Sequence, residues 1–89
     1  DWRARRLVGY CPDIDAFYED LSGRRFVWTM ARLCGYTRGE SARRTEEVLE
    51  RVGMAARADR KLRGYSKGMR QLIKLAQALL HDPELLILD

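Results

Sequence analysis

A serine and a glycine, Ser66 and Gly68, begin an amphipathic stretch in the last third of this 89-residue chain. The N–H groups in the first turn of a helix have no partner within the helix and carry a partial positive charge, so such a turn can bind an anion. Ser66 could donate its hydroxyl to a phosphate oxygen, and Gly68 would let a ligand approach the backbone closely. The plain alternative is that Ser66 is an ordinary N-cap residue, the commoner role of serine at this position.

Two basic residues, Lys67 and Arg70, lie in the same predicted turn, although acidic residues are favoured at the start of a helix. We therefore expect an anion to compensate their charge. Residues 57–74 hold seven basic side chains and one acidic one, whereas residues 13–20 hold four acids and no base, which favours an anionic partner for the basic segment. The acids that follow Asp13 are expected to form a solvated loop: Asp15, Glu19 and Asp20.

A carboxylate at the end of a buried strand is the second candidate. Residues 85–88 are all aliphatic, without alternation, which predicts a strand covered on both faces, and Asp89 follows directly. Open α/β sheets bind ligands at the carboxyl ends of their strands, and an Asp there can hold Mg²⁺ through water beside nucleotide phosphates. The alternative is a core strand that ends in a turn-forming Asp.

The elements that must position these residues are predicted in the order strand, helices, strand. Ser22 is expected to cap the first helix, and Gly35 and Gly53 to end the first and second. Residues 54–65 have no sustained periodicity and are predicted to be a loop. The expected bounds are a strand from Arg6 to Cys11 closed by Pro12, a loop or short helical turn over 14–21, helices over about 23–34, 40–52 and 66–80, and a strand over 85–88.

Apolar residues at helical spacing predict the inner face of each helix. The expected positions are Phe26, Val27, Met30, Ala31, Leu33 and Cys34 in the first helix, Thr45, Val48, Leu49 and Val52 in the second, and Met69, Leu72, Ile73, Ala76, Leu79 and Leu80 in the third.

The composition argues against a membrane-spanning protein, a secreted protein held by disulfides and a zinc protein. The formal charge is +4, no apolar run approaches the about 20 residues that a membrane span needs, and no signal-peptide pattern is present. Cys11 and Cys34 have no close pairing and His81 is the sole histidine, so a reduced cytosolic setting is favoured over disulfides or a zinc site. Because the chain opens on Asp1 and stops directly after an apolar strand, we expect a fragment of a longer protein.

The stretch from Tyr65 to Asp89 resembles the ATP-binding-cassette (ABC) family, namely its signature motif, the following helix and the Walker B strand. The family pattern is Leu-Ser-Gly-Gly-Gln. Residues 65–69, Tyr-Ser-Lys-Gly-Met, keep the serine and the second glycine and look like the exporter-type branch. The similarity continues through Arg70 and Gln71, through residues 75–79 and through Asp82-Pro83, with family-like spacing.

The resemblance also covers the beginning of the chain. Residues 8–12 look like the strand that leads to the Q-loop, and residues 21–24 look like the segment that opens the helical subdomain. Asp13 stands where the family usually has Gln, whose amide contacts Mg²⁺ or the attacking water and relays the nucleotide state to the membrane domains. A carboxylate there could still bind water or metal, but its charge departs from the family pattern.

The fold that this resemblance implies is an α/β fragment, mostly helical, flanked by two short core strands of a P-loop NTPase sheet. Residues 1–13 would be the core strand and Q-loop region, residues 14–65 the helical subdomain, and residues 66–89 the signature helix and Walker B strand. The phosphate-binding Gly-x-x-x-x-Gly-Lys-[Ser/Thr] loop is absent from these 89 residues.

The function that the resemblance implies is that of an ATPase subunit powering transport, with ATP and Mg²⁺ as cofactors. Asp89 would orient Mg²⁺, and Asp13 would sense the site. The partners would be a second nucleotide-binding subunit, arranged head to tail, and transmembrane permease subunits that hold the protein on the cytoplasmic face of the membrane. The residues expected to meet the γ-phosphate of the partner's ATP are Ser66 and Gly68, with Tyr65, Lys67, Met69 and Gln71 beside them. The fragment alone is expected to be inactive.

Two other classes of protein are weighed against this interpretation. A nucleic-acid-binding module would use the basic segment and two successive helices, but the connection from Val52 to Ser66 exceeds the usual three- or four-residue turn, and the last helix has few polar residues that read bases. We expect no specific nucleic-acid partner. A purely structural helical domain explains the apolar stripes but neither Ser66 with Gly68 nor Asp89. A paired-carboxylate hydrolase is least favoured, because nothing fixes the separation of its acids.

Overall fold

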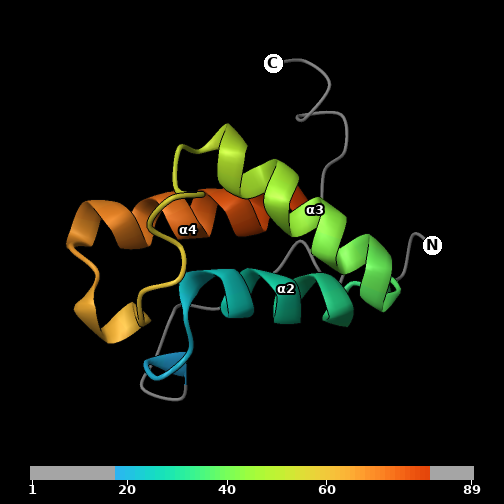
Figure 1. Cartoon of the computed structure of the whole chain (residues 1–89), viewed down its shortest axis with the longest axis horizontal. Helices are drawn as coiled ribbons and strands as arrows, with labels where there is room; N and C mark the ends of the chain where they lie inside the picture. Colours follow the sequence, from blue (N-terminus) through green and yellow to red (C-terminus); the bar gives the residue numbers. More distant parts are fainter. Residues whose placement is uncertain (1–17, 81–89) are drawn as a thin grey trace.

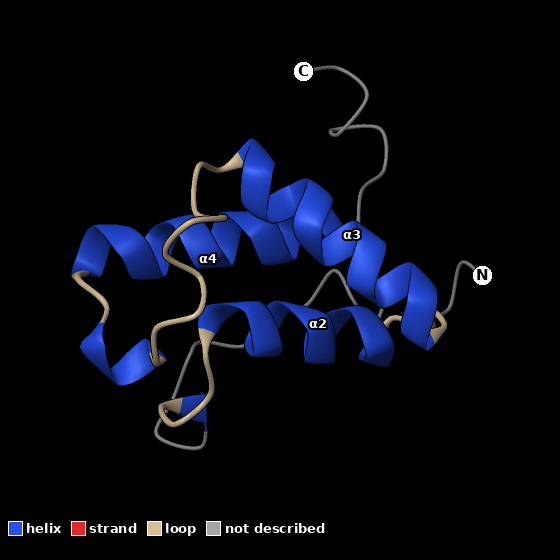
Figure 2. Ribbon diagram, viewed as in Figure 1, coloured by secondary structure: helices blue, strands red, loops and turns tan. Residues whose placement is uncertain are grey.

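The computed structural model describes residues 18–80, which form three α-helices packed against one another (Figure 1). The helices are α2 (Gly23–Leu33), α3 (Arg38–Arg51) and α4 (Lys67–Leu80), and a short 3₁₀ helix, η2 (Leu62–Gly64), precedes α4. Figure 2 shows no strand in this part of the chain, where the one β-type pairing is an isolated bridge between Ser22 and Lys61. The mostly helical character is therefore confirmed. Both predicted strands lie outside the described residues.

Helix α2 begins where its cap was predicted. The Ser22 Oγ accepts a hydrogen bond of 3.0 Å from the Arg25 N–H, and Gly35, just after the helix, has the left-handed φ of 99°. The buried face is as expected except for two residues: Leu33 is 70% exposed, and Cys34, the C-cap residue, is only partly buried. At about 100° per residue, Leu33 lies about 90° from the centre of the buried face, in the last position of the helix.

Helix α3 begins two residues before the predicted start, because of a capping box. The Thr37 Oγ1 accepts from the Glu40 N–H at 3.1 Å, and the Glu40 carboxylate accepts from the Thr37 N–H at 3.0 Å. The Thr-x-x-Glu spacing was visible in the sequence. The helix ends before Gly53, which has a φ of 76°, as predicted.

The connection from Met54 to Tyr65 is a loop, as predicted, but part of it is buried. Met54, Ala58, Leu62 and Tyr65 are buried in the core that the three helices share. Their spacing of four, four and three residues was a signal that a search for one regular helix missed. The connection also closes over the start of α2, because the Ala58 carbonyl accepts from the Arg24 N–H at 2.9 Å.

Helix α4 begins at Lys67, as predicted, and its apolar stripe forms the centre of the core. All expected positions are buried except Leu72, which is partly buried, and Gln77 is buried as well, although it was not predicted. None of the helices in the described range is long and apolar enough to cross a membrane. The fold thus places the start of α4 at the end of the long connection, beside the residues that precede α2 (Figure 1).

Candidate functional site

Ser66 caps helix α4 and remains exposed. Its Oγ accepts a hydrogen bond of 3.1 Å from the Met69 N–H, and its carbonyl accepts one of 3.0 Å from the Arg70 N–H. The N-cap interpretation is therefore right. The capping bond leaves the hydroxyl able to bind a ligand, because the Ser66 Oγ accepts in that bond and its O–H can still donate.

Gly68 lies in the first turn of α4, open to solvent. A Cβ built on it would meet no atom of the described residues closer than the Ser66 Oγ, at 4.0 Å, and its φ is not left-handed. Neither packing nor backbone conformation within this part of the chain requires a glycine there. The bare backbone leaves room for a group from outside to approach.

The other predicted site residues divide into an outer and an inner pair. Lys67 and Gln71 are exposed beside Ser66 and Gly68, so these four residues form one surface, which we call the signature turn. Tyr65 and Met69 point into the core, with 7% and 9% exposure. The inner pair can anchor the signature turn from below.

Tyr65 fixes the signature turn to α2 and to the long connection. Its hydroxyl donates to the Arg57 carbonyl at 3.3 Å, and burial raises the pKa of that hydroxyl. Gly23, at the start of α2, lies so close that a Cβ there would collide with the Tyr65 hydroxyl and come within 3.1 Å of the Ile73 Cδ1. Gly23 is therefore required for this close packing.

Arg70 is compensated within the chain. Its guanidinium donates two parallel hydrogen bonds to the Glu19 carboxylate, at 2.9 and 2.6 Å, and a third to the Leu62 carbonyl at 2.9 Å. The hydrogen bonds from Arg70 hold the pKa of the Glu19 carboxyl below its usual range, and the same pairing raises the pKa of Arg70. The solvated acidic loop was thus the wrong prediction for Glu19. Asp20 also pairs, with Arg63, although its side chain is mostly exposed.

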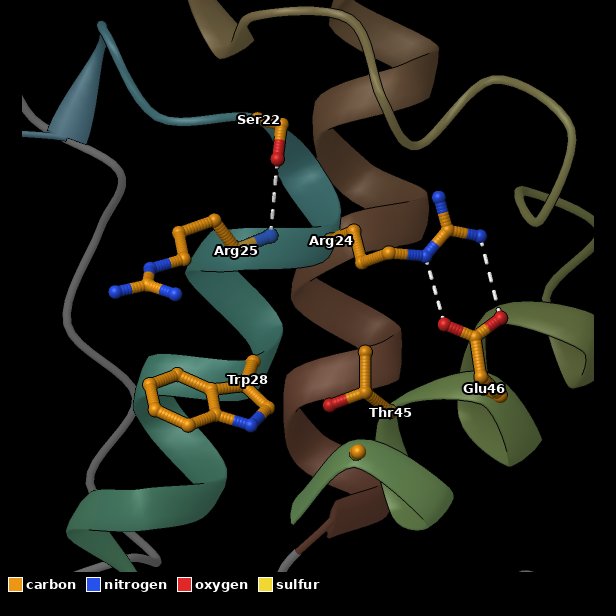
Figure 3. Close-up of a pocket in the computed structure, with 7 residues that line it drawn as sticks. Ser22, Arg24, Arg25, Trp28, Thr45 and Glu46 are labelled. Atoms are coloured by element: carbon orange, nitrogen blue, oxygen red, sulfur yellow. Dashed lines mark hydrogen bonds and ion pairs between the residues drawn. The ribbon is translucent and has the colours of Figure 1, made fainter. Parts of the chain in front are cut away.

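A concave feature lies between α2 and α3. It is an open groove of about 350 Å³, with Trp28 of α2 and Thr45 of α3 among the residues that line it (Figure 3). The Arg25 guanidinium lies over the Trp28 ring, 4.6 Å from its centroid. The Thr45 Oγ1 is buried and has no hydrogen-bond partner among the described residues. The groove can hold an apolar group, and the sequence interpretation missed it.

Arg24 borders this groove and joins three segments. It donates to the Glu46 carboxylate from Nε at 2.7 Å and from Nη2 at 3.2 Å, to the Ala55 carbonyl at 3.0 Å, and also to Asp59 (Figure 3 shows the pair with Glu46). Hydrogen bonding to Glu46 raises the pKa of Arg24. The guanidinium therefore links α2, α3 and the long connection.

The predicted metal-binding residue lies outside this geometry. Asp89 and Asp13 both fall outside residues 18–80, so their roles stay predictions. Within residues 18–80, no group of three or more His, Cys, Asp or Glu side chains could hold a metal ion. The described part does contain an exposed surface at the start of α4, with the hydroxyl of Ser66, the open backbone at Gly68 and the cation of Lys67.

A helical chain with a Ser/Gly turn at the start of its last helix agrees with the class of protein that the whole sequence matches. Residues 1–89 match the ABC transporter family, and the chain belongs to it. The match confirms the resemblance seen in the sequence. It gives no support to a nucleic-acid-binding module.

Individual relatives are proteins of the same kind. The chain is 44% identical over 85 residues to an uncharacterized ABC transporter ATP-binding protein of Bacillus subtilis, covering 96% of this chain and 29% of the relative. It is 38% identical over 87 residues to the linearmycin resistance ATP-binding protein of the same organism, covering 98% and 28%. It is 37% identical over 86 residues to ATP-binding cassette sub-family A member 7 of Mus musculus, covering 97% and 4%. The chain thus spans less than a third of the length of these relatives.

Proposed function

We propose that this chain is part of the ATP-binding, ATP-hydrolysing subunit of an ABC transporter, which powers movement of a substrate across a membrane. The observation that carries the proposal is the signature turn, within a chain of this family. Ser66 and Gly68 are exposed there, and neither the packing nor the φ of Gly68 requires glycine. An exposed helix start that also carries the cation of Lys67 suits an anionic ligand.

In this proposal the signature turn completes a site held by another subunit. Two subunits close head to tail, and Ser66 and Gly68 of one meet the γ-phosphate of ATP bound to the other. Lys67 adds positive charge, and Gln71 borders the contact. Tyr65 and Met69 hold the turn from within the core. Because this chain lacks a phosphate-binding loop, the 89 residues alone would neither bind ATP tightly nor hydrolyse it.

The remaining site residues complete the proposed chemistry. Asp89 orients Mg²⁺ through water, and Asp13 contacts the water or metal in the role that Gln has elsewhere in the family. Mg²⁺, when bound, would neutralise charge on the phosphoryl group of ATP, and the contribution of the protein would be mostly to position the reacting groups. Permease subunits would hold the protein on the cytoplasmic face of the membrane.

The first experiment measures ATP hydrolysis by the full-length subunit with its permease, after Ser66→Ala or Gly68→Asp. We expect kcat to fall roughly 100-fold, because a donor to the developing charge is lost or a carboxylate faces the phosphate. ATP binding to the separate subunit should not change. The control is Arg43→Gln, an exposed change in α3.

A mixing experiment tests whether the signature turn acts on the partner's nucleotide. A dimer of one Ser66→Ala subunit and one Asp89→Asn subunit has one complete site if Ser66 acts in trans, and none if it acts in cis. Each variant alone should be inactive, and the mixture should recover part of the activity. An inactive mixture with verified mixed dimers would contradict the trans arrangement.

A further inference from the structure

A paired Arg and Glu connect the signature turn with the residues that come before α2. The Glu19 carboxylate and the Arg70 guanidinium form a two-bond fork at 2.9 and 2.6 Å, between residues 51 positions apart in the chain. The two side chains are 25% and 29% exposed, so the pair is more sheltered than a surface ion pair. The third bond of Arg70, to the Leu62 carbonyl, adds the 3₁₀ helix η2 to the connection.

The backbone of the segment around Glu19 is held to the same region. The Glu19 carbonyl accepts from the Arg63 N–H at 3.0 Å, and the Leu21 carbonyl accepts from the Leu62 N–H at 2.8 Å. Glu19 therefore binds η2 through its main chain and α4 through its side chain. A displacement of this segment has to move the start of α4 or break these bonds.

Arg70 is also bound to the cap residue of the signature turn. Its N–H donates the i to i−4 bond of the helix to the Ser66 carbonyl at 3.0 Å, so the residue that binds Glu19 lies one helical turn from the cap. The stability of the helix alone does not explain an arginine here, because a cation in the first turn opposes the helix dipole. Glu19 offsets that cost and leaves Lys67 as the exposed cation of the signature turn.

We infer that Glu19 and Arg70 are positioning residues, which hold Ser66 and Gly68 in the orientation that meets the partner's nucleotide and tie them to the segment that follows Asp13. This inference rests on the proposed function of the signature turn. The two residues touch no substrate. They act by holding the turn in place, so their loss lowers the rate of the closed dimer and leaves ATP binding by the separate subunit unchanged.

The experiment uses the full-length subunit with its permease and compares Arg70→Ala, Glu19→Ala and the exchanged pair Glu19→Arg with Arg70→Glu. Each single change should lower kcat roughly tenfold to 100-fold, the effect of a misplaced group, with the affinity of the separate subunit for ATP within about twofold of wild type. The exchange should restore most of the rate, because the fork is rebuilt and Glu at position 70 suits the helix dipole.

Arg63 of η2 provides a matched control, because its partner Asp20 is the neighbour of Glu19. Arg63→Ala removes an ion pair with Asp20, whose side chains are 60% and 72% exposed and which does not involve α4. We expect this variant to keep the wild-type kcat. The thermal midpoint of every variant is measured alongside, so that a folding defect is recognised.

Three results would overturn the inference. One is a wild-type kcat in folded Arg70→Ala. Another is an equal loss of kcat in Arg63→Ala. The last is a parallel fall of kcat, ATP affinity and thermal midpoint that the exchanged pair does not reverse, which would make the pair merely structural. If Ser66→Ala is itself fully active, the proposed function fails instead, so the two failures are distinguishable.

Discussion

Gly23 and Tyr65 form a close contact that holds the start of α4, and with it the signature turn, against the start of α2. The Tyr65 hydroxyl occupies the space that a Cβ on Gly23 would need, and Tyr65 directly precedes Ser66. The start of α2 and the start of α4 can therefore pack closely only if residue 23 is glycine. A sequence pattern does not reveal this requirement, because the two residues are 42 positions apart and neither is unusual by itself.

We predict that Gly23→Ala destabilises the protein by about 1–3 kcal/mol, the usual cost of forcing an extra group into a packed site. The measurement is the thermal or urea-induced unfolding of the full-length subunit. Gly39→Ala is the matched control, because Gly39 also lies in the first turn of a helix but has open space around it. That change should stabilise by about 0.4–1 kcal/mol. Equal effects of the two substitutions would contradict this account.

Ser66 shows which roles of a residue can be predicted from its type and position in the sequence. The sequence left two alternatives for Ser66, a helix cap and a phosphate ligand, and the structure shows that the cap is present. The two roles do not exclude each other, because the capping bond uses an acceptor and a phosphate would use the donor. The environment of Gly68 could not be predicted from the sequence, because it depends on what surrounds the residue in space.

At the scale of elements, local signals predicted most of the helix bounds. Helices α2 and α4 begin where a serine can cap them, and Gly35 and Gly53 follow the ends of α2 and α3. The start of α3 was predicted two residues too late, although Thr37 and Glu40 have the spacing of a capping box. The long connection is different. Its buried residues belong to the core that the helices share, and their spacing of four, four and three residues is a weak local signal that does not correspond to one regular helix.

The capping box predicts a pH dependence of α3. Its hydrogen bonds with Thr37 hold the pKa of the Glu40 carboxyl below the usual range. A lowered pKa in the folded state contributes stability that is present above the unfolded pKa and is lost as the pH falls through the folded value. Glu40→Gln should therefore protect α3 less than wild type at pH 7, and the difference should shrink in acid.

Hydrogen exchange of the α3 amides in the full-length subunit, followed from pH 7 down to acid, measures this effect. Thr37→Ala should weaken the same amides by about 1 kcal/mol. Glu50→Gln, on the exposed side of the same helix, is the control and should change the protection little at any pH. A difference between Glu40→Gln and wild type that grows in acid would contradict the assignment.

At the scale of the whole molecule, the fold is fastened by ion pairs between distant segments. Arg70 reaches Glu19 across 51 residues, and Arg24 reaches Glu46 across 22 and Asp59 across 35. In the sequence, Glu19 is one of four clustered acids, and Arg24 is one of two adjacent arginines. Which charges pair depends on how the helices cross, so sequence analysis predicted the charge asymmetry but not the partners.

Adjacent glutamates on α3 give a direct test of whether these long-range pairs hold the helices together. Glu46 and Glu47 are almost equally exposed, at 53% and 52%. Glu46 binds Arg24 of α2 at 2.7 Å, whereas Glu47 binds Arg44 of the same helix at 3.7 Å.

We expect Glu46→Ala to lower the thermal midpoint of the full-length subunit and to speed hydrogen exchange in α3 and around Ala55, because Arg24 loses its main partner. Glu47→Ala removes a pair within one helix and should change both measurements little. Equal effects of the two changes would mean that the Arg24 connection adds nothing beyond an ordinary surface pair. A larger effect of Glu46→Ala would instead assign to Arg24 the coupling of α2, α3 and the long connection that supports the signature turn.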